Sequence, residues 1–151
     1  MDKLKLLKVN LKEHLEIIKN SYTHFTGEYL PVDPHLSLVE AFDMCSFPIA
    51  SHDNSKEPLF NYANKAALLL FKMTSKQMIG LPSKVSAKLI NQKERSLFLH
   101  QVIENGFIQH YQGKRVASDK SIFHIQDATV WNLINHDKKY YGQAVIIFKV
   151  S

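Results

Sequence analysis

The chain has 151 residues, of which 45% are hydrophobic and 22% are charged. It is therefore long enough to bury the core of one domain and too apolar to be a disordered chain. The formal net charge of +5 comes from scattered lysines, without the basic run or stripe that indicates a nucleic-acid binder. No segment approaches ~18 consecutive apolar residues, and the charged N-terminus lacks the apolar region of a signal peptide, so no membrane association is predicted. The single cysteine, Cys45, excludes a disulfide within the chain and favours a reducing cytoplasm.

The first predicted element is an amphipathic helix between about Lys3 and Tyr22. Its apolar residues recur at steps of three and four, which places them on one helical face: Leu4, Leu7, Leu11, Leu15, Ile18 and Tyr22. The stripe is narrow, as in helices that pair with one another. Two interpretations follow, namely that the helix packs on its own domain or that it pairs with a second copy in a homodimer.

A short helix is predicted next, because Asp33-Pro34 offers an N-cap followed by proline at the first helical position. It is expected to end near Met44. Two strands, at residues 47–50 and 58–62, are then expected to form a hairpin around the polar turn 51–57.

Capping residues mark the helices in the middle of the chain. Asn64 is the expected N-cap of an apolar helix over residues 65–72. Thr74-Ser75-Lys76-Gln77 has the pattern of a capping box, which predicts a further short helix ending at Gly80. A longer helix is predicted over residues 91–105, where Asn105-Gly106 stops it.

The last third is rich in β-branched and aromatic residues, which predicts three consecutive strands at residues 107–117, 121–134 and 140–150. Together with the earlier pair, they make an α+β domain: a five-stranded antiparallel sheet covered on one face by short helices, with the amphipathic helix at the N-terminus. The predicted units are a helix and connector over residues 1–33 and the domain over residues 34–151. A cavity between sheet and helices is the expected ligand site.

This order of elements resembles the PAS fold, and local motifs narrow the resemblance. The motifs are PLFNYANKAAL at 58–68, LPSKVSA at 81–87, ER at 94–95, YQGKRV at 111–116, VWNL at 130–133 and GQA at 142–144. Together, over about residues 36–148, they resemble the MEKHLA domain, a PAS-like family of stand-alone bacterial proteins and of the C-terminus of plant class III homeodomain–leucine zipper factors. The resemblance implies a sensory or interaction module, without naming a ligand. One departure is His136-Asp137-Lys138-Lys139, where PAS hairpins usually carry glycine.

The candidate pocket residues lie on the last three strands: Tyr111, Arg115, Phe123, Ile125, Asp127, Trp131 and Gln143. Arg115 has the planar fork that binds a carboxylate or phosphate, although an internal ion pair with Glu94 or Asp127 is the favoured interpretation. Alternation from Phe123 to Leu133 would place Asp127 on the covered face, where it needs a partner. Trp131 is either a core aromatic bonded to a backbone carbonyl or a stacking wall for a flat ligand.

The preferred function is a non-catalytic module that binds a small apolar or aromatic molecule and relays its occupancy through a homodimer or a protein partner. The alternatives are an interaction module with a filled core and a small-cavity enzyme using Asp127. No cofactor is identified. Haem on His100 has no support from the flanking sequence, Cys45 lacks the motif of light-sensing flavin domains, and no metal site is predicted.

Overall fold

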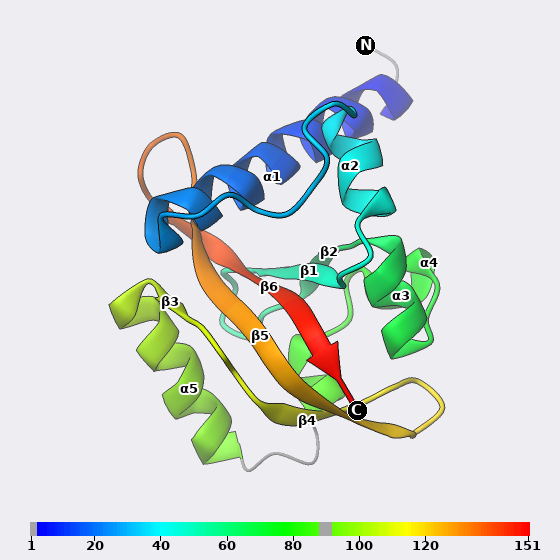
Figure 1. Ribbon diagram of the computed structural model, residues 1–151, viewed down its shortest axis with the longest axis vertical. Helices are drawn as coiled ribbons and strands as arrows, with labels where there is room; N and C mark the ends of the chain where they lie inside the picture. Colours follow the sequence, from blue (N-terminus) through cyan, green and yellow to red (C-terminus); the bar gives the residue numbers. More distant parts are fainter. Residues whose placement is uncertain (1–2, 88–91) are drawn as a thin grey trace.

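The computed structural model describes residues 3–87 and 92–151. In chain order the elements are α1 (Lys3–Thr26), α2 (Leu38–Met44), β1 (Ile49–Asp53), β2 (Phe60–Ala63), α3 (Lys65–Phe71), α4 (Ser75–Met78), the 3-10 helix η1 (Ser83–Ala87), α5 (Gln92–Asn105), β3 (Phe107–Ile108), β4 (Gly113–Val116), β5 (Ile122–Ile134) and β6 (Tyr140–Val150). Helices pack around one antiparallel sheet, which confirms the predicted α+β class (Figure 1). None of the described helices is long and apolar enough to cross a bilayer.

The sheet has six strands in the order β2-β1-β6-β5-β3, with β4 also paired to β5. The single strand predicted over residues 107–117 is wrong, because it splits into β3 and β4. His110 has a φ of 58° between them, a left-handed conformation that breaks an extended strand. At the other side of the sheet, β1 continues to Asp53, three residues into the segment predicted as a turn.

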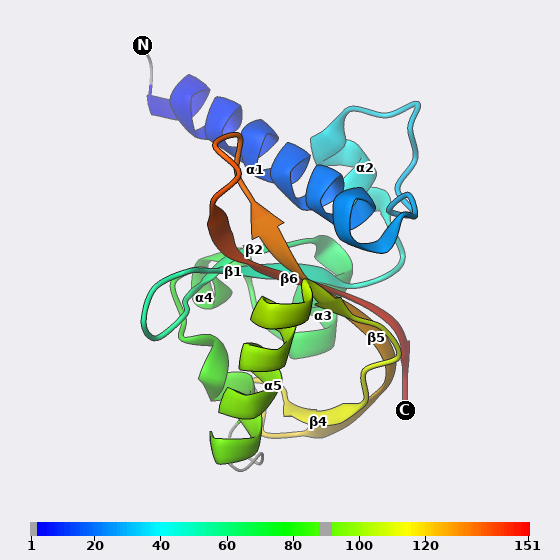
Figure 2. The same ribbon diagram turned by 90° about the vertical axis from the view of Figure 1, so that its left-hand side faces the viewer.

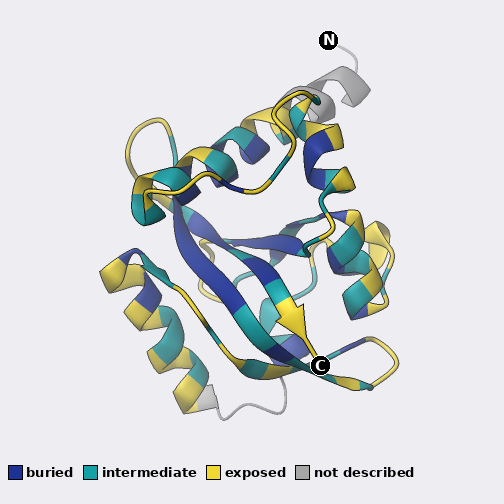
Figure 3. Cartoon of the chain, in the orientation of Figure 1, coloured by how far each residue is buried: buried dark blue, intermediate teal, exposed yellow. Residues whose placement is uncertain are grey.

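Helices lie on both faces of the sheet. Figure 2 shows α1 and α2 on one side and α3, α4 and α5 on the other. Burial follows the sheet between these two layers, along β1, β5 and β6 (Figure 3). Each face therefore has its own apolar cluster.

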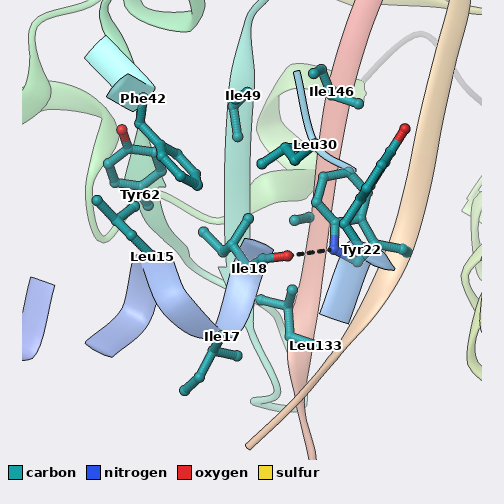
Figure 4. Packing of buried hydrophobic residues seen from close by; sticks show 12 residues of the cluster. Leu15, Ile17, Ile18, Tyr22, Leu30, Phe42, Ile49, Tyr62, Leu133 and Ile146 are labelled. Atoms are coloured by element: carbon teal, nitrogen blue, oxygen red, sulfur yellow. Dashed lines mark hydrogen bonds between the residues drawn. The ribbon is translucent and has the colours of Figure 1, made fainter. Parts of the chain in front are cut away.

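Helix α1 packs on its own domain, as the first of the two interpretations proposed. Leu15, Ile18 and Tyr22 are at most 2% exposed and belong to one cluster with sheet residues. The indole N–H of Trp131 donates to the Ile18 carbonyl oxygen at 3.2 Å, the dashed bond in Figure 4. Tyr22 meets the Trp131 ring edge-on, with 4.9 Å between ring centres. The side chains of Leu4 and Leu7 lie outside the described residues.

The two predicted middle caps are confirmed. The Asn64 side chain accepts from the Ala67 backbone N–H as the N-cap of α3, and Thr74 forms the capping box that opens α4. The cap predicted at Asp33 is wrong. Its carboxylate accepts from the His35 N–H within a turn, whereas Ser37 caps α2.

The face alternation predicted for β5 fails at Asp127. The pairing of β5 with β6 shifts register on both sides of this residue, and a bulge of this kind transfers the following side chains to the other face. Ile125 therefore clusters with Ala128 on the α5 side, while Trp131 and Leu133 belong to the cluster under α1. Asp127 itself points outward, where its carboxylate lies 3.2 Å from His110 Nδ1.

Candidate ligand pocket

A cavity of about 100 Å³ lies on the face of the sheet opposite α1. Strands β1, β5 and β6 form its floor, and η1, α5 and β4 form its rim. Its apolar walls are mainly Phe60, Phe71, Phe98, Leu99, Ile125 and Val130. The polar and charged residues that line the same space include one from each of five different elements, namely His52, Ser83, Arg95, Arg115 and Gln143. An apolar cavity with a few convergent polar groups is the usual form of a small-molecule site.

A chain of hydrogen bonds positions Arg95 on α5. Its Nη2 donates to Ser83 Oγ at 2.8 Å, and Ser83 Oγ lies 3.3 Å from His52 Nδ1. On the other side of the ring, His52 Nε2 lies 3.1 Å from the Gln143 carbonyl oxygen. This oxygen only accepts, so Nε2 carries a proton. Burial lowers the pKa of His52, although the bond to Gln143 partly opposes this effect. Burial therefore favours the neutral ring, in which Nδ1 accepts from Ser83.

The series of hydrogen bonds that begins at Arg95 continues from Gln143 to the C-terminal half of α5. The Gln143 amide nitrogen lies 3.4 Å from the Leu99 carbonyl oxygen and 3.2 Å from Asn132 Oδ1. The Asn132 amide donates in turn to the carbonyl oxygens of Val102 and Ile103, at 3.0 and 3.1 Å. The C-terminal half of α5 is thereby bonded to the sheet through Asn132 and through Gln143, and Gln143 also lines the pocket.

Arg115 is positioned by an aromatic pair. Its Nη2 donates to the Tyr111 hydroxyl at 2.8 Å, and its guanidinium carbon lies 5.4 Å from the centre of the Tyr111 ring. Phe98 of α5 stacks on the same ring, with 4.4 Å between centres. Gly113 makes room for this arrangement, because a Cβ there would lie 2.5 Å from the Tyr111 hydroxyl and 3.3 Å from Arg115 Nη1.

Two positively charged side chains line the pocket. The sequence contains 17 lysines and only two arginines, and both arginines line this cavity. No carboxylate of the described residues forms an ion pair with either guanidinium. Burial and the neighbouring charge of Arg115 both lower the pKa of Arg95, as expected for two cations that share a partly buried space.

Comparison of the sequence with protein-family models identifies its family. The model of the MEKHLA domain matches residues 12–151. The chain belongs to the MEKHLA domain family. The match includes residues 12–26 of α1, the part of this helix that packs on the sheet, and every element of the pocket. No curated protein matches the chain.

Solved structures similar to this MEKHLA domain have the PAS fold. A PAS domain from Colwellia psychrerythraea superimposes with a TM-score of 0.59 at 18% identity, over 73% of this chain and 91% of that one. An RNA-binding light-oxygen-voltage receptor gives a TM-score of 0.65 at 18% identity, over 81% of this chain and 36% of the receptor. The light-state dimer of the fungal photoreceptor Vivid gives 0.59 at 10% identity, over 86% and 90%. These likenesses confirm the fold expected from the sequence.

Four of the candidate residues proposed from the sequence line the cavity: Tyr111, Arg115, Ile125 and Gln143. Phe123 lies beside it, where its ring packs against Phe71 with 5.2 Å between centres. The ion pairs considered for Arg115 are absent from the described residues, since Arg115 donates to Tyr111 and to the Lys114 carbonyl oxygen instead.

The other two candidates lie away from the cavity. Trp131 is buried under α1 on the opposite face of the sheet, so the core alternative describes it and the stacking alternative does not. Asp127 is turned to the surface beside His110. Both misplacements have one cause, the register shifts at Asp127 that invalidate strict alternation along β5.

The pocket also contains residues that were not proposed from the sequence. His52 was missed because it lies in the segment predicted as a turn, and Arg95 and Ser83 because helix residues give no local sign of which sheet residues they meet. The scarcity of arginine is the signal that could have identified Arg95. The lysine side chains that the structure describes are exposed or partly exposed, so the two positions that use arginine indicate a need for its planar guanidinium group.

The residues considered for cofactors lie outside the cavity. His100 is exposed on α5 and pairs with Glu104 at 3.0 Å. Cys45 lies near the end of α2, with its sulfur 3.6 Å from the Pro31 carbonyl oxygen. Among the described residues no cluster of histidine, cysteine and carboxylate side chains could hold a metal ion.

Proposed function

We propose that this MEKHLA domain is a sensory module that binds a small molecule in the pocket and relays its occupancy without chemical conversion. The observation that carries the proposal is the cavity itself, in which polar side chains from five elements converge between apolar walls. The hydrogen bonds that hold Arg95 and Arg115 are formed within the protein. Groups that are positioned in advance lose less conformational freedom when a ligand binds.

Helix α5 is the element best placed to relay occupancy. It contributes Arg95 and Phe98 to the pocket, and its C-terminal carbonyl groups are held by Asn132 and Gln143. A ligand that contacts Arg95 therefore acts on the first half of α5, and a ligand that contacts Gln143 acts on its second half. Differential contacts of this kind are what allow a ligand to shift a conformational equilibrium.

The pair formed by Ser83 and His52 does not support a hydrolase. A catalytic histidine is oriented by a carboxylate that stabilises the imidazolium formed during the reaction. The corresponding partner here is the neutral amide of Gln143, and the pKa of the buried His52 is lowered. The serine–histidine chain is better suited to holding Arg95 in place.

The enclosed volume of this pocket is too small to bury the ring system of a flavin. A cavity of roughly 150 Å³ accommodates one benzene ring, so about 100 Å³ has no room for three fused rings. The only cysteine, Cys45, also lies outside the lining. The proposed ligand is accordingly much smaller than a flavin.

Two features predicted from the sequence remain proposals. A cytoplasmic location is supported by the single unpaired cysteine. A homodimer is supported by the fold likeness to the Vivid dimer. In this chain such a dimer would use surfaces other than Leu15, Ile18 and Tyr22, which pack on the sheet.

Native mass spectrometry of the purified protein tests the proposal, because it detects both a retained small molecule and a dimer. The matched variant is Ala87→Leu, which adds three carbon atoms at a cavity wall that is 2% exposed. We expect a small-molecule adduct, or stabilisation by members of a fragment library, in the wild type and not in the variant. Equal responses of the two proteins, or no response in either, would refute ligand binding at this pocket.

Hydrogen exchange tests the relay separately. If occupancy is relayed through α5, bound ligand slows exchange of the amides between Val102 and Asn105. Protection confined to the residues that line the cavity would contradict the relay and leave binding intact.

A further inference from the structure

Both arginines of the sequence line the pocket. They come from different elements, Arg95 from α5 and Arg115 from β4, and they line one cavity of about 100 Å³. No acidic side chain of the described residues neutralises them there. Two partly buried cations that share a space repel each other, and an anion between them removes this cost.

Both guanidinium groups are held by hydrogen bonds within the protein that leave some of their donors unused. Arg95 uses Nη2 for Ser83, and Arg115 uses Nη1 and Nη2 for the Lys114 carbonyl and the Tyr111 hydroxyl. A guanidinium has five N–H donors, so donors remain on each group. This planar geometry matches a carboxylate, which accepts two parallel hydrogen bonds.

The cavity volume and its walls restrict the remainder of the ligand. Because a cavity of roughly 150 Å³ accommodates the six carbon atoms of benzene, about 100 Å³ accommodates roughly four to five non-hydrogen atoms. Most of the other lining residues are apolar, and they include phenylalanine, leucine, isoleucine and valine side chains. They favour a short hydrocarbon tail over a second charged group.

We propose that the pocket binds a short-chain monocarboxylate, with the carboxylate between Arg95 and Arg115 and the alkyl tail against the apolar walls of the cavity. This inference depends on the proposed ligand-binding function and names its ligand class. The hydrogen bonds among Ser83, His52 and Gln143 then also have a role, because they hold the Arg95 guanidinium group in position.

The test uses calorimetric titration of the full chain with propionate, with the neutral isostere propionamide and with inorganic phosphate. Propionate is expected to bind at least roughly tenfold more tightly than propionamide, because only the ion forms charge-assisted hydrogen bonds. Arg95→Gln and Arg115→Gln should each weaken propionate binding by roughly ten- to a hundredfold. The control Lys76→Gln removes a charge from an exposed position of α4 that does not line the cavity, and it should leave binding within about twofold of the wild type.

Each outcome separates this inference from the proposed function. Equal affinity for propionate and propionamide would overturn the carboxylate assignment while ligand binding stands, and so would tighter binding of phosphate. Absence of propionate binding in a protein that retains another small molecule in native mass spectra would do the same. If either glutamine variant loses its circular dichroism signal, Arg95→Lys and Arg115→Lys replace it. The lysine variants keep the positive charge and lose the planar guanidinium group. Wild-type affinity for propionate in both variants would overturn the inference.

Discussion

His14 gives the docking of α1 a measurable dependence on pH. Its side chain is 7% exposed, with Nε2 2.9 Å from Ser51 Oγ and Nδ1 3.1 Å from the Tyr141 hydroxyl. Burial lowers the pKa of His14 to about 4 from an ordinary value of 6.5. The folded protein therefore keeps this ring neutral at pH values where the unfolded chain has already bound a proton.

The sign and size of the effect follow from this difference in pKa. As the pH falls below 6.5, the unfolded state gains a proton that the folded state accepts only near 4, so stability is lost on acidification and is fully present above 6.5. The complete loss is roughly 3 kcal/mol, of which about 2.5 kcal/mol has occurred by about pH 4.5. His52, whose pKa is also lowered, changes stability in the same direction, so the effect of His14 must be isolated with a variant.

Urea unfolding of the wild type and of His14→Gln, between about pH 7.5 and 4.5, isolates the contribution of His14 to the pH dependence of stability. The free energy of unfolding of the wild type should fall relative to that of the variant by about 2.5 kcal/mol over this range. The variant is expected to be the less stable protein at neutral pH, because it loses the packed ring. A constant difference between the two proteins at all pH values would refute the buried, neutral histidine and with it this docking of α1.

Three further predictions concern the pocket and the core. Gly113→Ala should displace the Tyr111 hydroxyl and weaken propionate binding by roughly tenfold in calorimetric titrations, with little change in melting temperature; unchanged affinity would contradict the proposed role of this glycine. The fluorescence of Trp131 should not respond to propionate, whereas a Phe98→Trp reporter in a Trp131→Phe background should respond; the opposite result would place the ligand under α1. Asn64→Ala should lower the free energy of unfolding by about 3–5 kcal/mol in urea, because four backbone groups lose their partner; a loss below about 1 kcal/mol would contradict this network.

Local sequence rules predicted the features that depend on a few neighbouring residues. Asn64 and Thr74 cap the helices expected of them, because a side chain that bonds to the following turn acts within four residues. Gly106 ends α5 with a φ of +91°, as the Asn105-Gly106 pair predicts. The stripe of α1 identified a buried face in the same way, since helical spacing fixes which side chains share a side.

The pocket could be predicted only in part, because its geometry depends on contacts between distant segments. Alternation along β5 holds until the register shifts at Asp127, and these depend on pairing with β6 rather than on the local sequence. His52 and Ser83 are 31 positions apart, and Arg95 meets them only after α5 folds over the sheet. Motif matching identified Arg115 and Gln143, although it could not give them partners.

The most direct test of the central claim is a methyl NMR titration of the domain with propionate. Binding in the pocket predicts shifts of the Leu99, Ile125 and Val130 methyl signals, which come from the cavity walls. Signals of Leu15 and Leu133, buried under α1 on the opposite face, should stay in place. Shifts confined to the α1 face, or none at saturating propionate, would contradict a carboxylate site between the two arginines.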